Sequence, residues 1–300
     1  MTRPRIGFLV SGPKGLSLLK GLQTSCEIAF VSSHPVRGLR LDAYAEVREF
    51  CRAHGCVFVE RDALTASVLQ QADAVFVAGW QYLIAHEHER LVVFHDSLLP
   101  EVRGFAPTVT ALIAGRDRIG VSAFRPVAAF DAGPLYAQAA ASVTYPLTIR
   151  DAYTKLAACY TEAGQHVLGL MARQSLLASA TPQDESRATY SVWRGPDDYL
   201  IDWRWSAAKI RRFIDAVGWP YEGARTTYGG DVITVVSAHE IADLQFEERH
   251  AGKVWRIEDG CPEIICGHGM LRIDEAVTAS GAPVSFTRVR ERLGAGIASP

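Results

Sequence analysis

The chain has 300 residues, with 31 Lys and Arg against 33 Asp and Glu, so its formal net charge at pH 7 is −2. This near balance excludes a protein that holds nucleic acid or an anionic membrane by bulk charge. Hydrophobic residues make up 48% and charged residues 21% of the chain, a composition typical of a folded globular protein. A chain of this length is expected to form a large domain and a smaller one.

Localisation and metal content are predicted from the same composition. No apolar run approaches the roughly 18–20 residues of a membrane span, and the first residues do not form a signal peptide. The six cysteines are scattered, which favours free thiols in a reducing, cytoplasmic setting. The Cys and His residues lack zinc-site spacing, so no metal is expected. A cytoplasmic enzyme that does not bind membranes is the class that fits best.

Short apolar runs alternate with amphipathic stretches in the first half of the chain. Strands are predicted at residues 6–10, 28–31, 57–59, 74–78 and 91–94, and helices at 16–22, 41–53 and 64–71, with a short polar helix over 86–89. This alternation is typical of a parallel sheet covered on both faces. Ligands of such sheets bind beyond the carboxyl ends of the strands, so the candidate site lies at the turns after Val10, Ala78 and Phe94.

The pattern changes after Pro107. A short helix is predicted at 108–114, strands at 119–125 and 135–143, and a long helix that begins near residue 150. Residues 175–206 lack sustained periodicity and are interpreted as a linker. A helix at 207–216 then precedes short strands at 232–236, 253–257, 263–266 and 271–274, which fit a small β-barrel. The predicted domains are 1–180 and 206–300, joined by a linker at 181–205.

Two side chains are candidate catalytic residues. His95 follows a buried strand, where a parallel sheet presents reactive groups, and an imidazole exchanges protons near neutral pH. Asp131 lies in the turn before Gly133, and a carboxylate that folds back onto His95 would raise the basicity of the imidazole and fix its tautomer. The simpler alternatives are a histidine that only hydrogen-bonds loop backbone and an aspartate that only forms a turn.

Several segments resemble the folate-dependent formyltransferases: residues 95–107 (HDSLLPEVRGFAP), the turn at 131–133, residues 183–190 and residues 201–203. This family includes methionyl-tRNA formyltransferase and the enzymes that N-formylate nucleotide-linked amino sugars. The resemblance covers residues 4–280. It implies a Rossmann-like domain with a mostly parallel sheet, followed by a barrel related to the OB fold. It also implies 10-formyltetrahydrofolate as the donor and a primary amine that attacks the formyl carbon through a tetrahedral intermediate.

The catalytic trio of this family is Asn, His and Asp, and His95 and Asp131 match the last two. The Asn position is occupied by Val93, which cannot donate a hydrogen bond to the oxyanion. Such a donor is worth roughly 3–4 kcal/mol in a preorganised site. Asp96 is a second departure, since the family generally has proline or a small residue there. Its carboxylate would repel an oxyanion but could hold an ammonium group, so Asp96 is predicted to contact the acceptor.

The remaining predicted site residues lie in three loops. The resemblance places the segment after the fourth strand at the pterin pocket, where a flat ring needs apolar and aromatic walls. Ordinary packing is the alternative for Trp80 and Tyr82, and a structural ion pair is the alternative for Arg103. The predicted donor site comprises Trp80, Tyr82, Leu83, Ile84, Ser97, Arg103 and Gly104. Gly12 and Lys14 are assigned to the substrate, because a Gly-rich turn at a helix N-terminus can receive a phosphate.

Charge distinguishes between the two acceptor classes of the family. Residues 206–300 contain 11 Lys and Arg and 13 Asp and Glu, a poor surface for tRNA. The favoured function is therefore N-formylation of a small amine, with a nucleotide-linked amino sugar as the leading acceptor and tRNA disfavoured. The alternatives are a methionyl-tRNA formyltransferase, a degenerate relative that binds folate or nucleotide without turnover, and an enzyme with another acyl donor. The sequence is compatible with a homodimer but does not decide it.

Overall fold

The computed structural model describes residues 3–36, 40–84, 90–173 and 176–294. The chain divides into two compact units, the first made of residues 1–108, 117–143 and 151–192, and the second of residues 109–116, 144–150 and 193–300. Two short segments of the first half of the chain therefore belong to the second unit. The predicted boundaries at residues 180 and 206 stay a prediction, and the polar helix predicted over 86–89 lies outside the described residues.

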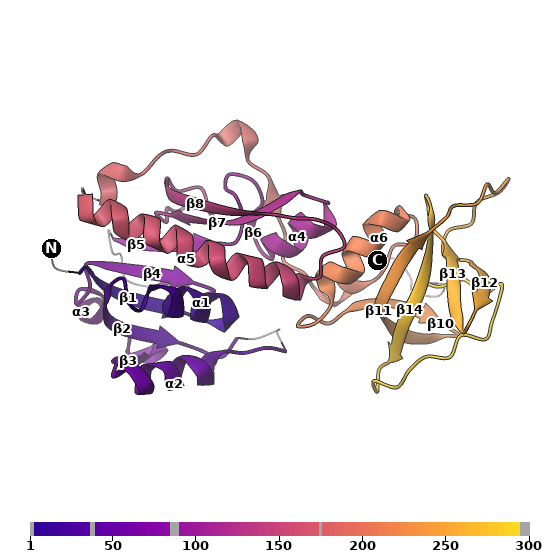
Figure 1. Cartoon of the computed structure of the whole chain (residues 1–300), viewed down its shortest axis with the longest axis horizontal. Coiled ribbons are helices and arrows are strands. Elements are labelled where there is room, and N and C mark those ends of the chain that lie inside the picture. The colour runs from indigo at the N-terminus through magenta and orange to yellow at the C-terminus, as the bar shows by residue number, and fades with distance from the viewer. Residues whose placement is uncertain (1–2, 37–39, 85–89, 174–175, 295–300) are drawn as a thin grey trace. The chain divides into compact units, whose positions relative to one another are not determined.

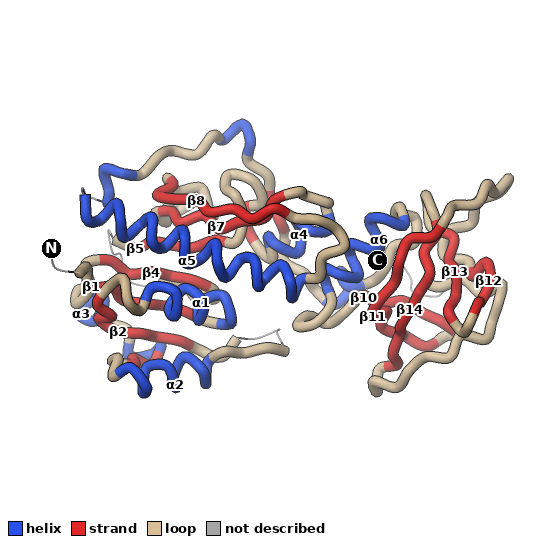
Figure 2. Tube along the Cα trace, viewed as in Figure 1, coloured by secondary structure: helices blue, strands red, loops and turns tan. Residues whose placement is uncertain are grey.

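A seven-stranded mixed sheet forms the centre of the first unit (Figures 1 and 2). Its order is β3-β2-β1-β4-β5-β7-β8, and the bounds are β1 Arg5–Val10, β2 Glu27–Ser33, β3 Phe58–Glu60, β4 Ala74–Ala78, β5 Leu91–His95, β7 Arg118–Phe124 and β8 Leu135–Ser142. The first five strands in this order, β3-β2-β1-β4-β5, pair in parallel with their neighbours, whereas β7 pairs antiparallel with both β5 and β8. This sheet confirms the predicted Rossmann-like fold class.

Helices α1 (Gly12–Leu22), α2 (Tyr44–His54), α3 (Ala66–Leu69), α4 (Pro107–Ile113) and α5 (Ile149–Arg173) follow the strands. Helices α1 and α5 lie side by side (Figure 1) and approach closely at Gly21, where a Cβ would collide with Thr161. Under α5, the ring of Tyr160 lies 6.4 Å from that of Phe94, which in turn lies 5.2 Å from Phe76. This row of buried rings forms the core on one face of the sheet.

Residues that alternate with these along the strands point to the other face of the sheet. They form a second core cluster that includes Leu9, Phe30, Val75 and Val77 together with Leu69 of α3. The side chains of Trp80, Ile84 and Val93 pack against this cluster and are partly buried. The segment that follows β4 is therefore attached to the core at the edge where the parallel strands end.

A five-stranded antiparallel sheet forms the second unit, in the order β10-β11-β14-β13-β12. Its bounds are β10 Ala224–Tyr228, β11 Asp231–Ile241, β12 Val254–Glu258, β13 Cys261–Ile265 and β14 Met270–Thr278, and helix α6 is Ala207–Val217. The sequence analysis missed β10, because its Arg-Thr-Thr centre carries little apolar signal. The carboxy-terminal antiparallel domain is confirmed, while its relation to the OB fold stays a prediction.

The segment interpreted as a linker contains structure of its own. It has single-turn 3-10 helices at Leu176–Ser179, Glu185–Arg187 and Pro196–Tyr199, and a two-residue strand, β9 (Tyr190–Ser191). Strand β9 pairs in parallel with β6 (Arg103–Gly104), which brings this segment onto the loop after His95. Strands of two residues show no periodicity, so sequence patterns alone do not reveal this pairing. Within the described ranges, no helix is long and apolar enough to span a membrane.

Candidate active site

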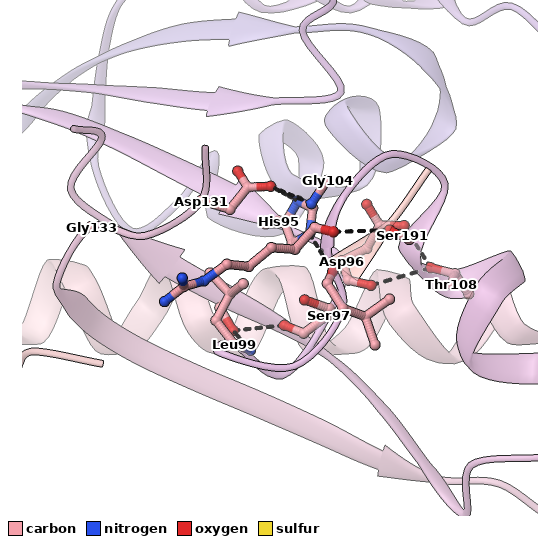
Figure 3. A network of polar contacts seen from close by, with 12 residues as sticks. His95, Asp96, Ser97, Leu99, Gly104, Thr108, Asp131, Gly133 and Ser191 are labelled. Carbon is pink, nitrogen blue, oxygen red and sulfur yellow. Dashed lines mark hydrogen bonds and ion pairs between the residues drawn. The ribbon is translucent and has the colours of Figure 1, made fainter. Parts of the chain in front are cut away.

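His95 is the last residue of β5 and faces Asp131, which lies between β7 and β8 (Figure 3). Its Nδ1 lies 3.7 Å from Asp131 Oδ2, and its Nε2 lies 3.1 Å from the backbone oxygen of Val102. A carbonyl oxygen only accepts, so the contact at Nε2 requires a proton on that nitrogen. Nδ1 is then the nitrogen that carries no proton in the neutral ring, and it faces the Asp131 carboxylate. The structure thus brings together the two side chains predicted to be catalytic.

The turn that carries Asp131 is held from several sides. Its φ is +51°, a conformation that non-glycine residues rarely adopt. The carboxylate Oδ2 accepts a hydrogen bond of 2.8 Å from the Gly104 N–H (Figure 3). The Gln183 side-chain amide donates to the backbone oxygens of Asp131 and Gly133, at 2.7 and 2.6 Å. These contacts fix a strained turn and direct its carboxylate toward His95.

Gln183 is a positioning residue that the sequence analysis did not single out, although it begins the 183–190 segment. Its Oε1 accepts a hydrogen bond of 2.8 Å from Arg103 Nη2. The Arg103 side chain is only 2% exposed, and Glu185 accepts two further hydrogen bonds from it, at 2.7 and 2.9 Å. Arg103 therefore forms the structural ion pair that was the alternative for it, and its assignment to the donor site stays a prediction.

Lys14 and Asp96, both predicted to bind the acceptor, form an ion pair with each other. Lys14 Nζ lies 2.5 Å from Asp96 Oδ2, and Thr108 Oγ1 donates to the same oxygen at 2.5 Å (Figure 3 shows the Thr108 contact). Burial raises the pKa of Asp96, but the Lys14 ammonium, the neighbouring His95 and these hydrogen bonds outweigh burial and lower it to about 2. The Asp96 carboxylate is therefore charged and paired with the Lys14 ammonium, which reduces its repulsion of an oxyanion beside His95.

Gly12 opens α1 with φ +64°, in the left-handed region that favours glycine. Ser11 is the N-cap of this helix, and its side chain makes no capping hydrogen bond. The backbone of Ser11 is also approached closely by Gly79, where a Cβ would lie 2.3 Å from the Ser11 carbonyl oxygen. Only glycine fits at position 79, so the loops that follow β1 and β4 are held together at this edge of the sheet.

His34, which the sequence analysis missed, packs under the predicted pterin segment. It directly follows β2 and is 4% exposed, and its ring lies edge-on to Trp80 and Tyr82 with centroid distances of 4.8 and 4.6 Å. Its Nδ1 lies 3.0 Å from the Pro35 carbonyl oxygen and carries the proton of that contact, so Nε2 is left to accept from the Gln81 N–H at 3.5 Å. Its place three residues beyond the end of the strand predicted at 28–31 is the signal that could have identified it.

The other predicted donor residues differ in exposure. Leu83 is 95% and Tyr82 38% exposed, so both are open to a ligand, whereas Ile84 packs on the core cluster. The Ser97 hydroxyl is buried and has no hydrogen-bond partner in the structure. Val93 packs on the same core cluster as Ile84 and brings no polar group to the site. Tyr82 and Leu83 thus offer exposed aromatic and apolar surface, whereas the Val93 side chain offers no hydrogen-bond donor, and the assignment of this segment to the donor site stays a prediction.

Acidification is expected to destabilise the protein through His34. Burial is the main cause that lowers the pKa of this imidazole; Arg61 acts in the same direction, whereas Pro35 and Asp42 oppose it. The unfolded chain binds the proton more readily, so the destabilisation is absent well above the ordinary pKa of about 6.5 and grows as the pH falls below it. Urea unfolding at pH 7.5 and 5.5 should show a larger loss for the wild type than for His34→Gln. Equal losses in both proteins would exclude His34 as the source.

Comparisons with known proteins agree with this geometry. Residues 57–168 match the family described as formyl transferase, and residues 195–291 match the formyl transferase C-terminal domain. The chain is 28% identical over 275 residues to the methionyl-tRNA formyltransferase of Methylobacillus flagellatus, which covers 87% of each chain. It is 30% identical over 272 residues to that of Dechloromonas aromatica, covering 85% of this chain and 84% of the relative. The chain belongs to the folate-dependent formyltransferase family.

The family assignment makes this protein an enzyme of the transferase class and confirms the resemblance found in its sequence. In its fold, this formyltransferase is similar to the N-formyltransferase of Helicobacter canadensis, solved in complex with folinic acid and dTDP-3-aminofucose. The TM-score is 0.63 at 13% identity, and the match covers 91% of this chain and 99% of the other. At this identity the likeness concerns the fold alone.

Proposed function

We propose that this formyltransferase moves the formyl group of 10-formyltetrahydrofolate to the primary amine of a nucleotide-linked amino sugar. The pairing of cations with carboxylates in the second unit is the observation that carries the choice of a small acceptor. Arg249 Nη2 lies 2.7 Å from Asp243 Oδ1, and Arg256 Nε lies 2.7 Å from Glu263 Oε2. Further pairs in this unit are Arg204–Asp202, Arg211–Asp215, Arg272–Glu258 and Arg288–Glu291. Cations that bind RNA must be available to its phosphates, whereas these contact carboxylates.

The reaction proposed for His95 and Asp131 is a proton transfer coupled to attack by the amine. The acceptor nitrogen forms a bond to the formyl carbon and gives a tetrahedral intermediate. Nδ1 of His95 takes the proton that the amine loses, and the charged ring then lies beside both the oxyanion and the Asp131 carboxylate. When the intermediate collapses, the bond to N10 of the folate breaks and the proton passes to that nitrogen. The products are the N-formyl acceptor and tetrahydrofolate.

A comparison of acceptors tests this proposal. The purified protein is expected to convert 10-formyltetrahydrofolate to tetrahydrofolate only when a nucleotide-linked amino sugar is added. The donor is followed by absorbance and the formylated acceptor by mass spectrometry, with methionyl initiator tRNA and amine-free reactions alongside. Faster formylation of the charged tRNA than of every amino sugar tested would contradict the proposal.

Methionyl-tRNA formylation is the second candidate function. The observation in its favour is the 28–30% identity to relatives of that name over most of the chain. A tRNA acceptor predicts a rate that falls steeply with added salt, because binding then releases counterions from the phosphates. A nucleotide-linked amino sugar carries far fewer phosphate groups than a tRNA, so its formylation should depend much less on salt, and a salt series separates the two candidates.

We also infer a reducing, cytoplasmic location for this reaction. All six cysteines lie within the described residues and are free thiols. Burial raises the pKa of Cys26, Cys51 and Cys266 to about 12, so these thiols stay protonated and unreactive at neutral pH. Six free thiols without a structural disulfide are typical of proteins in a reducing compartment, which supports this location.

A further inference from the structure

A pocket of about 680 Å³ in the first unit opens beside the catalytic carboxylate. Phe130 and Ala132, the two neighbours of Asp131 in the chain, both line this pocket. Gly104 lines it as well, and its N–H donates to Asp131 Oδ2 at 2.8 Å. A ligand in the pocket is therefore one residue away from the side chain that faces His95.

Three aromatic side chains form the walls of the pocket and are unusually exposed. Phe130 is 75%, Tyr190 68% and Phe105 44% exposed, and the rings of Phe105 and Phe130 lie 6.4 Å apart at an angle of 54°. In folded proteins, exposed aromatic side chains that surround one pocket are typical of a binding site, whereas exposed apolar residues elsewhere are usually scattered singly. Rings that are held by strands β6 and β9 and by the Asp131 turn offer flat apolar faces to a ligand.

The charges of this pocket cancel. Arg103 and Glu185 both line it, but Arg103 is 2% exposed and its Nη2 lies 2.7 Å from Glu185 Oε1. No unmatched cation among the described lining residues is left for a phosphate group. The chemistry of the walls therefore favours a planar, neutral ring that stacks on aromatic side chains.

We propose that this pocket binds the nucleobase of the acceptor, with the amino sugar reaching from it to His95. This inference rests on the proposed function and adds the place where its nucleotide is recognised. Of the residues predicted to bind the donor, Arg103 and Gly104 line the pocket, but the aromatic segment at residues 80–84 expected to hold the flat pterin ring does not, which favours the acceptor over the folate as the source of the ring. Phe130 is then the residue through which base recognition and the position of Asp131 are linked.

Binding without turnover tests the pocket directly. Thymidine diphosphate and uridine diphosphate are titrated by calorimetry into the wild type, Phe130→Ala and Phe130→Tyr. Only Phe130→Ala is expected to bind them about tenfold more weakly, the loss typical of one base-stacking side chain. Inorganic pyrophosphate should bind all three equally, and Trp255→Ala, an exposed aromatic of the second unit, should behave as the wild type. Phe130 is largely exposed, so unchanged thermal unfolding is expected to show that the variants fold. Equal nucleotide affinity in Phe130→Ala and the wild type would overturn the inference.

Kinetics separate this inference from the proposed function. With a nucleotide-linked amino sugar, Phe130→Ala should raise the acceptor KM about tenfold and leave the donor KM within twofold. The same amino sugar as its 1-phosphate, without a base, should show no difference between the variant and the wild type. A rise in the donor KM instead would assign the ring to the folate and overturn the inference. A wild type that binds nucleotide but formylates no amino sugar would refute the proposed function and leave the base pocket supported.

Discussion

Replacing His95 with alanine is expected to lower the rate of formyl transfer at least roughly a hundredfold, with little change in folded stability. The imidazole is the group whose Nδ1 faces the Asp131 carboxylate at 3.7 Å, and its side chain is 11% exposed at the end of β5. In the proposed mechanism, its removal takes away both the proton acceptor and the positive charge next to the oxyanion. Single-turnover kinetics with saturating donor and acceptor measure the chemical step, and thermal unfolding checks that the variant is folded.

Asp131 offers a matched pair of variants for the same experiment. In Asp131→Asn the side-chain oxygen can still accept the Gly104 hydrogen bond, and asparagine tolerates the left-handed backbone. Asp131→Ala loses that hydrogen bond as well as the charge, and should fall at least roughly a hundredfold in rate. A slow Asp131→Asn of normal stability would attribute the effect to the charge. Full activity in both alanine variants, at positions 95 and 131, would refute the assignment of this site.

Lys14→Met is expected to cost about 3 kcal/mol of folded stability, the low end of the range for breaking a buried ion pair. The Lys14 and Asp96 side chains are 21% and 12% exposed, so the variant leaves a carboxylate with little solvent and no cation at 2.5 Å. Methionine keeps the apolar stem beside the Tyr153 ring, which the Lys14 ammonium contacts at 4.5 Å. Urea unfolding at pH 7 measures the loss. The double variant with Asp96→Asn should recover most of it, because the amide still accepts from Thr108.

The same pair predicts how the wild type responds to acid. The pKa of Asp96 is lowered from about 3.8 to about 2, so its contribution to stability is complete above pH 4 and is lost as the pH falls toward 2. Without Lys14, burial raises the pKa of Asp96, and the variant should take up this proton at a higher pH. If Lys14→Met and the wild type lose stability in parallel between pH 7 and 3, the ion pair does not hold Asp96 charged.

Much of the fold follows from local patterns. The strand 74–78 and the helix that begins at residue 207 are placed within one residue by apolar periodicity, because each buries one continuous set of side chains. Strand β10 and the pair β6–β9 were not found, since their residues are polar or few and become ordered only through a partner strand. Sequence periodicity indicates which face of one element is buried, but it carries no information on which distant segment packs or pairs with that element.

The residues of the candidate site also fall into those that local sequence patterns predict and those that only the packed structure reveals. His95 and Asp131 could be predicted, because one ends a strand of a parallel sheet and the other stands in a recognisable turn. Gln183 and His34 were not singled out, because their effect depends on contacts with Asp131 and with the Trp80–Tyr82 segment across the fold. Likewise, the Asp96 side chain that sequence reasoning assigned to the acceptor is charge-matched by Lys14, which lies 82 residues earlier.

The near balance of charge, the two-domain length and the strand–helix alternation were determined by the sequence itself, because they are sums or periods of the residues in order. The tertiary structure alone decided where the charges are matched: Arg103 with Glu185, Lys14 with Asp96, and Arg249 with Asp243. An ion pair needs two side chains within about 4 Å, and that distance depends on the register of packed elements. Net charge therefore indicated a small acceptor, and only the packed chain assigned the individual charges to partners.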